Sequence, residues 1–318
     1  MPLFANILLL ILGFVLLVKG ADWLVDGAAA FARKLKISDL AIGLTVVAFG
    51  TSMPELVVNI AASVDGFDHI ILGNIIGSNN FNLFFTLGLA GLIAPLVVRS
   101  STVWREIPLS MLAIVLLFLF ATLVTPSGSM LISRLEGAIM LVVFGLFLAY
   151  VALQLKADSS QEGVLIRNLS VPKASAFLLL GLAGLILGGK LVVTHAVTLA
   201  EELGISQKII GLTIVAMGTS LPELVTSVVA VIKKNTDIAV GNVIGSNIFN
   251  IVLILAISAL IKPVGYALTF NTDIYLLAGG TIFLFIAMFT GQKKKLDRWE
   301  AGILFAVYIA YTIYLVVQ

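Results

Sequence analysis

Two glutamates, Glu55 and Glu223, each lie about 18 residues into a long apolar stretch of the chain. A lone carboxylate at the centre of a bilayer costs at least ~2.5–3.5 kcal/mol, so it must be protonated, paired with a cation or in contact with water. Neither glutamate has a basic partner at membrane depth in its own predicted helix. Two such carboxylates in one bundle of helices suit a divalent cation.

Other oxygen-bearing side chains surround the glutamates at helical spacing. A threonine precedes each glutamate by four residues, which places the two side chains on one face of a helix. A serine and an asparagine recur at the same spacing in two later segments. Oxygen donors without sulfur or imidazole suit a hard cation such as Ca²⁺ or Na⁺ rather than zinc or copper. The candidate side chains are Glu55, Glu223, Thr51, Thr219, Ser52, Ser220, Ser78, Asn82, Ser246 and Asn250.

Two prolines add backbone oxygens to this set. Pro54 cannot donate a hydrogen bond to the carbonyl of Gly50, and Pro222 cannot donate to that of Gly218. Carbonyl oxygens freed at membrane depth are tolerated only where they are buried in protein or line a wet cavity. The prolines therefore predict interrupted helices that face a polar interior.

The amino-acid composition indicates the environment in which these residues lie. Of the 318 residues, 60% are apolar and 11% are charged, whereas a soluble domain has about 25% charged residues. This excludes an ordinary soluble protein and a disordered chain, and a net charge of +2 excludes a nucleic-acid binder. The absence of cysteine excludes disulfides and thiolate metal sites. The sequence therefore predicts an all-α polytopic membrane protein without a cofactor.

Ten stretches are long and apolar enough to span a bilayer, for which about 20 residues are needed. Fourteen of the nineteen lysines and arginines fall in the odd-numbered loops between these stretches and only three in the even-numbered loops. The positive-inside rule then places the odd loops in the cytoplasm. We predict a multi-pass protein of the cell (inner) membrane with both termini on the extracellular or periplasmic side. The ten stretches cover residues 3–30, 38–64, 69–94, 105–124, 132–154, 173–200, 206–232, 238–261, 272–291 and 299–317.

The polar segments occur twice at an offset of 168 residues. Residues 43–59 (GLTVVAFGTSMPELVVN) match residues 211–227 (GLTIVAMGTSLPELVTS) at twelve of seventeen positions, and 73–82 match 241–250 at eight of ten. Five helices in each copy mean that the second copy enters the membrane from the opposite side, an arrangement typical of secondary transporters. We predict two inverted five-helix repeats, 1–155 and 172–318, joined by a short cytoplasmic linker at 156–171.

The two GTS(M/L)PEL blocks, each followed by GN(I/V)IGSN, closely resemble the α-repeats of the cation/Ca²⁺ exchanger superfamily, in particular its Na⁺/Ca²⁺ exchanger-like prokaryotic branch. The resemblance implies that Glu55 and Glu223 are the central Ca²⁺ ligands and that the first and sixth helices slide to alternate access. It also implies that the Ca²⁺ and Na⁺ sites are completed by Thr51, Ser52, Ser78, Thr219, Ser220, Ser246 and the carbonyls of Ala48 and Ala216. Some members carry aspartate at one of the positions of Asn82 and Asn250, whereas both are asparagine here.

The predicted function is electrogenic antiport of three Na⁺ for one Ca²⁺, and not an enzymatic activity. An H⁺/Ca²⁺ antiporter that uses the same two glutamates is the main alternative, although proton-coupled relatives usually have GN in place of GTS in the first block. A Ca²⁺ channel and an intramembrane hydrolase using Ser52 or Ser220 are disfavoured, the latter because neither serine has a histidine or lysine base in its motif. The expected partners are Ca²⁺, Na⁺ and the lipid bilayer, with K⁺ co-transport left open and no protein partner or nucleic acid.

Overall fold

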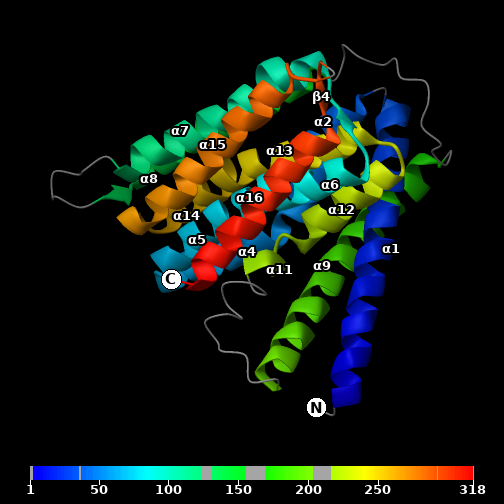
Figure 1. The fold of residues 1–318 in the computed structure, drawn as a ribbon, viewed down its shortest axis with the longest axis horizontal. Coiled ribbons are helices and arrows are strands. Elements are labelled where there is room, and N and C mark those ends of the chain that lie inside the picture. The colour runs from blue at the N-terminus through cyan, green and yellow to red at the C-terminus, as the bar shows by residue number, and fades with distance from the viewer. Residues whose placement is uncertain are drawn as a thin grey trace.

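The computed structural model describes residues 3–35, 37–122, 130–154, 169–202, 216–291 and 293–317, which fold almost entirely into helices (Figure 1). The first half contains α1 (Leu3–Leu35), α2 (Asp39–Ile42), π-helix η1 (Gly43–Val47), α3 (Ala48–Thr51), α4 (Met53–Asp65), α5 (Asp68–Asn80), π-helix η2 (Phe81–Thr86), α6 (Leu87–Ile93), strand β1 (Leu96–Val97), π-helix η3 (Thr102–Glu106), α7 (Ile107–Thr122), strand β2 (Leu131–Ile132) and α8 (Arg134–Gln154). The second half contains α9 (Val171–Glu202), α11 (Ala216–Gly218), α12 (Leu221–Ile232), α13 (Thr236–Phe249), π-helix η5 (Asn250–Leu255), α14 (Ala256–Ile261), strand β3 (Val264–Gly265), 3₁₀-helix η6 (Leu268–Phe270), α15 (Asn271–Ala287), strand β4 (Lys295–Leu296) and α16 (Arg298–Val317).

Among the described residues, six helices are long and apolar enough to cross a membrane, and a bent pair, Asp39–Thr51 with Met53–Asp65, makes a seventh candidate. The other predicted stretches are also helical where they are described, as α5–η2–α6, α12 and α16. Large apolar side chains such as Phe4, Leu135 and Leu153 are more than two-thirds exposed, as expected for a surface in contact with lipid. The chain is an all-helical membrane protein. The predicted linker lies largely outside the described residues, and the division into repeats remains a prediction.

The segment from α13 to α14 forms the centre of the molecule. In its most apolar window, 78% of the residues are buried inside the protein, compared with 22–39% for the other five candidate spans. This explains why the segment tolerates Asn242, Ser246 and Asn250, all fully buried, because their neighbours are protein groups rather than lipid.

The helix that carries each glutamate is broken just before it. α3 ends at Thr51 and α4 begins at Met53, and the segments Asp39–Thr51 and Met53–Asp65 meet at an angle of 47°. In the second half, α11 ends at Gly218 and α12 begins at Leu221. A proline lies in the first turn after each break: it cannot continue the preceding helix, and the helix that it starts needs no N–H donor at this position. Each glutamate therefore lies at a helix N-terminus, and the carbonyl end of a short helix lies before it.

Contacts between the two halves of the chain occur in matching pairs. Strand β1 pairs with β4, and β2 pairs with β3, so each two-stranded sheet joins one half to the other. Arg134 at the start of α8 donates to the carbonyls of Leu260 and Ile261, and Arg298 at the start of α16 donates to that of Ile93. These contacts hold the peripheral helices of each half against the central helices of the other.

Helices α1 and α9 lie side by side along their lengths and extend away from the other helices (Figure 1). The pair is tightly packed because glycines face each other: a Cβ atom on Gly20 would lie 2.8 Å from the carbonyl oxygen of Gly181. Small residues allow membrane helices to approach this closely. The two helices therefore form a unit that is distinct from the rest of the bundle.

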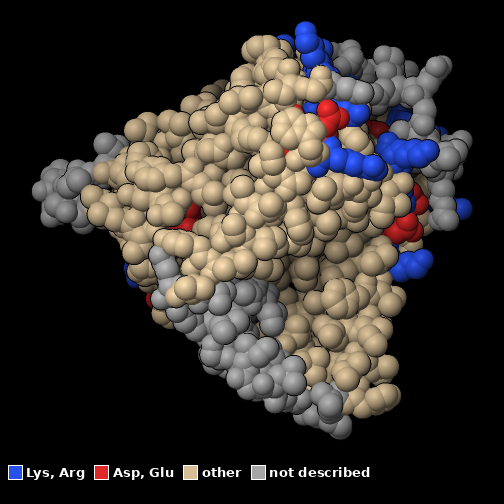
Figure 2. Space-filling view, viewed as in Figure 1, with Lys and Arg blue, Asp and Glu red and all other residues tan. Residues whose placement is uncertain are grey.

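Charged residues are unevenly placed on the surface. Figure 2 shows lysine and arginine gathered at one end of the molecule, where β4 lies in Figure 1, while the rest of this face is mostly uncharged. This end contains the last turn of α1 with Arg33 and Lys34, Lys233 directly after α12, and the β1–β4 sheet with Lys294 and Lys295; we call it the basic end. Uncharged helix surfaces with charge concentrated at one end are typical of a membrane protein whose basic loops stay on one side.

Candidate ion-binding site

The two glutamates meet in one site and exchange hydrogen bonds between the halves of the chain. Ser220 Oγ donates to Glu55 Oε1 at 3.0 Å, and Ser52 Oγ donates to Glu223 Oε1 at 2.9 Å. Both carboxyl groups are completely buried. Each half therefore supplies one carboxyl group and the hydroxyl that binds the other half's carboxyl group.

The second oxygen of each carboxyl group has no partner within the described structure. Glu55 Oε2 and Glu223 Oε2 are buried and accept no hydrogen bond, and none of the described lysines or arginines forms a salt bridge with either glutamate. Buried polar atoms are normally satisfied, and exceptions mark a functional site or a bound ion or water. Free carboxylate oxygens of this kind are ligands that hard cations prefer.

The threonines lie at the ends of the short helices. Thr51 Oγ1 contacts the carbonyl of Ala48 at 3.3 Å and Asn242 Oδ1 at 3.0 Å. Thr219 Oγ1 accepts a hydrogen bond from Asn74 Nδ2 at 3.5 Å. Ala48 begins α3 and Ala216 begins α11, so both predicted backbone ligands lie one turn before a break. Carbonyls at the C-terminal end of a helix carry partial negative charge and favour cations.

The serines and asparagines of the second motif are buried beside the glutamates, but only one of them contacts a carboxyl group directly. Ser246 Oγ donates to Glu223 Oε1 at 3.4 Å. Ser78 Oγ, both amide atoms of Asn82 and Oδ1 of Asn250 have no hydrogen-bond partner among the described residues. All four side chains are at most 1% exposed. A set of buried oxygens on four helices thus receives no hydrogen bond from the part of the chain that the structure describes.

Sequence reasoning did not identify a second layer of asparagines. Asn59 Nδ2 donates to the carbonyl of Glu55 at 2.8 Å and to Asn74 Oδ1 at 3.0 Å. Asn242 Nδ2 donates to the carbonyl of Glu223 at 3.2 Å and to Ser227 Oγ at 3.0 Å. These bonds tie each glutamate's backbone to the neighbouring helix. The 168-residue offset could have revealed them, because asparagine occupies both 74 and 242.

A chain of three asparagines determines which way Asn250 presents its amide. Asn79 Nδ2 donates to the carbonyl of Asn247, and Asn247 Nδ2 donates to the carbonyl of Asn79, both at 3.3 Å. Because a carbonyl can only accept, Asn79 must turn its Oδ1 toward Asn250, whose Nδ2 donates to it at 2.9 Å. The Oδ1 of Asn250 is consequently directed elsewhere and stays free. Asn82 has no such restraint.

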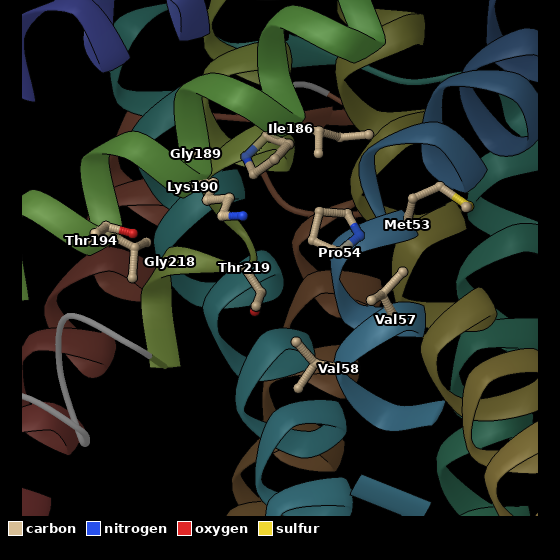
Figure 3. Close-up of a pocket in the computed structure, with 12 residues that line it drawn as sticks. Met53, Pro54, Val57, Val58, Ile186, Gly189, Lys190, Thr194, Gly218 and Thr219 are labelled. Carbon is tan, nitrogen blue, oxygen red and sulfur yellow. The ribbon is translucent and has the colours of Figure 1, made fainter. Parts of the chain in front are cut away.

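Two clefts reach the site from the end opposite the basic end. The first, of about 530 Å³, lies between α4 and α9; Met53, Pro54, Val57 and Val58 face α9 residues that include Lys190 and Thr194 (Figure 3). The second, of about 520 Å³, is lined by residues of α5, α15 and α16. Thr219 and Val58 line both clefts. Thr219 is a candidate ligand, so both clefts extend to the edge of the candidate site.

Comparisons with known proteins find relatives over almost the whole chain. The family model described as "Sodium/calcium exchanger protein" matches residues 5–153 and 173–317. The chain is 40% identical over 268 residues to inner membrane protein YrbG of Escherichia coli, covering 80% of this chain and 79% of that protein. It is 34% identical over 353 residues to the sodium/calcium exchanger MaX1 of Methanosarcina acetivorans, covering 98% of each. A structure of the sodium-calcium exchanger NCX_Mj soaked with Na⁺ and Sr²⁺ superposes with a TM-score of 0.83 at 32% identity, covering 97% of this chain and 98% of that one.

Proposed function

Because this chain belongs to the sodium/calcium exchanger family, we propose that it is a secondary antiporter that exchanges Na⁺ for Ca²⁺ at Glu55 and Glu223. The family is one of transporters, so the chain is not an enzyme. The observation that carries the proposal is the pair of completely buried carboxyl groups, each with one oxygen that accepts no hydrogen bond from the described residues. Free carboxylate, amide and hydroxyl oxygens are the ligands that Ca²⁺ prefers, and Ca²⁺ takes six to eight of them.

We further propose ten transmembrane helices, arranged as inverted repeats 1–155 and 172–318 around the linker 156–171, in the cell membrane with both termini outside. The 168-residue offset and the paired contacts between halves support the repeats. The concentration of basic residues at one end supports the orientation, because basic loops stay in the cytoplasm. In this orientation the two clefts open to the outside, and the basic end is cytoplasmic.

The proposed stoichiometry of three Na⁺ per Ca²⁺ follows from energy balance. Maintaining a ~10⁴-fold Ca²⁺ gradient requires about 5.5 kcal/mol per ion, and extrusion against 100 mV adds about 4.6 kcal/mol. Two Na⁺ entering down a tenfold gradient return roughly 7.3 kcal/mol, which is too little, whereas three return roughly 11 kcal/mol. The balance assumes that the physiological role is Ca²⁺ extrusion.

The same site supports H⁺/Ca²⁺ antiport as a second candidate. Glu55 Oε2 and Glu223 Oε2 lie unpartnered in the protein interior, and two protons on these oxygens would replace one Ca²⁺ without a change in charge. The GTS blocks favour Na⁺, since each adds a threonine and a serine oxygen beside a glutamate.

Flux measurements with imposed gradients distinguish the two candidates. We expect ⁴⁵Ca²⁺ uptake into proteoliposomes to require an outward Na⁺ gradient and not to be supported by an outward H⁺ or K⁺ gradient alone. Uptake that proceeds with H⁺ alone would establish the proton-coupled alternative. Uptake without any counter-ion inside the vesicles would refute antiport and indicate a channel.

Exchanging Asn82 and Asn250 for aspartate should affect the protein unequally. An ionised aspartate at 250 cannot donate to Asn79 Oδ1, so Asn250→Asp places two acceptors against each other. We expect it to lower the unfolding free energy by about 1–3 kcal/mol, measured as a lower melting temperature in detergent. Asn82→Asp breaks no hydrogen bond and should leave the melting temperature close to that of the wild type.

Both aspartate variants should change the dependence of uptake on Na⁺ and Ca²⁺ concentration, and both leucine variants should impair uptake. Equal melting temperatures for Asn82→Asp and Asn250→Asp would contradict the orientation assigned to Asn250. Unchanged ion dependence in all four variants would remove both asparagines from the ion site.

A further inference from the structure

A lysine clamps α1 to α12 at the basic end of the molecule. Lys233, the residue directly after α12, places its Nζ 2.7 Å from Asp22 Oδ1 and 2.6 Å from Asp26 Oδ1. The same Nζ donates to the backbone carbonyl of Asp22 at 2.8 Å. Asp22 and Asp26 are four residues apart on α1, so both face the lysine. We call these contacts the inner clamp, because they join α1 to the end of α12.

The 168-residue offset assigns a counterpart to each member of this clamp, with the charges exchanged. The backbone supports the match of Asp65 with Lys233, because each is followed by a residue with a positive φ: +80° at Gly66 and +61° at Lys234. The counterparts are Lys190 for Asp22, Thr194 for Asp26 and Asp65 for Lys233. The offset thus relates the aspartate on α1 and the lysine after α12 to a lysine on α9 and an aspartate at the end of α4.

The counterpart pair is open in this structure. Lys190 is exposed and lines the 530 Å³ cleft between α9 and α4 (Figure 3). Asp65 is exposed at the end of α4. Within the described part of the chain, neither residue forms a salt bridge. Lys233 is therefore paired with two aspartates at one end of the bundle, whereas the related residues Lys190 and Asp65 are unpaired among the described residues.

We propose that Lys190 and Asp65 form an outer clamp when the cleft between α9 and α4 closes. The inference rests on the proposed antiporter function, in which inverted repeats exchange conformations as access alternates. Helices α1 and α9 pack closely along their lengths, so movement of α9 toward α4 carries α1 away from α12. The inner and outer clamps consequently exclude each other.

The two clamps are unequal, and this sets the preferred state without ions. The inner clamp joins one lysine to two aspartates, whereas the outer clamp offers one lysine and one aspartate, because Thr194 replaces the second acid. The state with the cleft open is thus favoured. Releasing Lys233 shifts the population toward the closed cleft, since each clamp stabilises only one of two states.

Cross-linking tests the proximity of Lys190 and Asp65 independently of transport. The chain has no cysteine, so Asp65→Cys/Lys190→Cys introduces the only two thiols. A short bifunctional thiol reagent suits this pair better than direct oxidation, because disulfides require closely spaced Cα atoms. We expect the cross-link yield to change with Na⁺ or Ca²⁺ and to rise when Lys233→Gln is added. The Asp22→Cys/Lys233→Cys pair should respond to the ions in the opposite direction.

Swapping the charges of Lys190 and Asp65 tests the outer clamp by its effect on transport. Lys190→Asp and Asp65→Lys should each slow exchange by about two- to fivefold, as for loss of a surface ion pair, and the double variant should recover most of the wild-type rate. The matched control is Lys190→Asp/Asp68→Lys, which changes a nearby acid without a role in the clamp and should remain slow. Recovery in this control, or no cross-link at 65 and 190 under any ion condition, would overturn the proposal. If the wild-type protein takes up Ca²⁺ with a counter-ion other than Na⁺, the proposed function is refuted, but the cross-linking result for residues 65 and 190 remains valid.

Discussion

Glu55→Gln and Glu223→Gln are each expected to reduce Na⁺-dependent ⁴⁵Ca²⁺ uptake nearly to background. Glutamine keeps the size of the side chain and can still accept from Ser220 or Ser52, so the fold should be retained. The site loses one of its two negative charges in a completely buried environment. Removing one partner from a buried charge pair, here a carboxylate and the bound cation, costs about 3–5 kcal/mol, which corresponds to a loss of roughly 10²- to 4 × 10³-fold in ion binding.

A buried glutamate outside the site provides the control. Glu106 in η3 is 1% exposed and its carboxyl group accepts a hydrogen bond from Tyr150. Glu106→Gln keeps an acceptor for this bond and should transport at close to the wild-type rate. Detergent extraction and gel filtration check that all three variants are folded. Wild-type uptake in either Glu55→Gln or Glu223→Gln would refute the assignment of these residues.

Uptake into Na⁺-loaded proteoliposomes should accelerate when a K⁺ gradient with valinomycin makes the interior positive. With two carboxylates in the site, one Ca²⁺ gives a neutral site and three Na⁺ give a net charge of +1. Each cycle of Ca²⁺ uptake therefore removes one positive charge from the vesicle, and a positive interior favours it. A potential of 100 mV contributes about 2.3 kcal/mol per charge, which can change the Ca²⁺ accumulated at equilibrium by up to about 50-fold.

The sign of this effect is diagnostic. A negative interior should slow uptake by the same mechanism, and valinomycin without a K⁺ gradient should have little effect. Uptake that does not depend on the potential would refute three Na⁺ per Ca²⁺ and agree with two Na⁺ or two H⁺. A Ca²⁺ channel would show the reverse dependence, because entry of Ca²⁺ alone adds charge to the vesicle.

The sequence alone determined the class of protein, the family and the candidate side chains. Low charge and long apolar stretches leave few alternatives to a helical membrane protein. Glu55 and Glu223 could be identified without a structure because a carboxylate in the middle of an apolar stretch is costly unless it has a function. The helix breaks at Ser52 and Ser220 were also predictable, because proline removes a backbone donor wherever it occurs.

Only the tertiary structure decided which oxygens are free. Spacing along one helix places Thr51 beside Glu55, but it does not reveal that Ser220, 165 residues away, donates to that glutamate. The asparagine chain 247–79–250 also joins segments distant in sequence, and without it Asn82 and Asn250 look equivalent. Local sequence sets backbone conformation and the face of each side chain, whereas hydrogen-bond partners in a bundle depend on how the helices of both halves pack together.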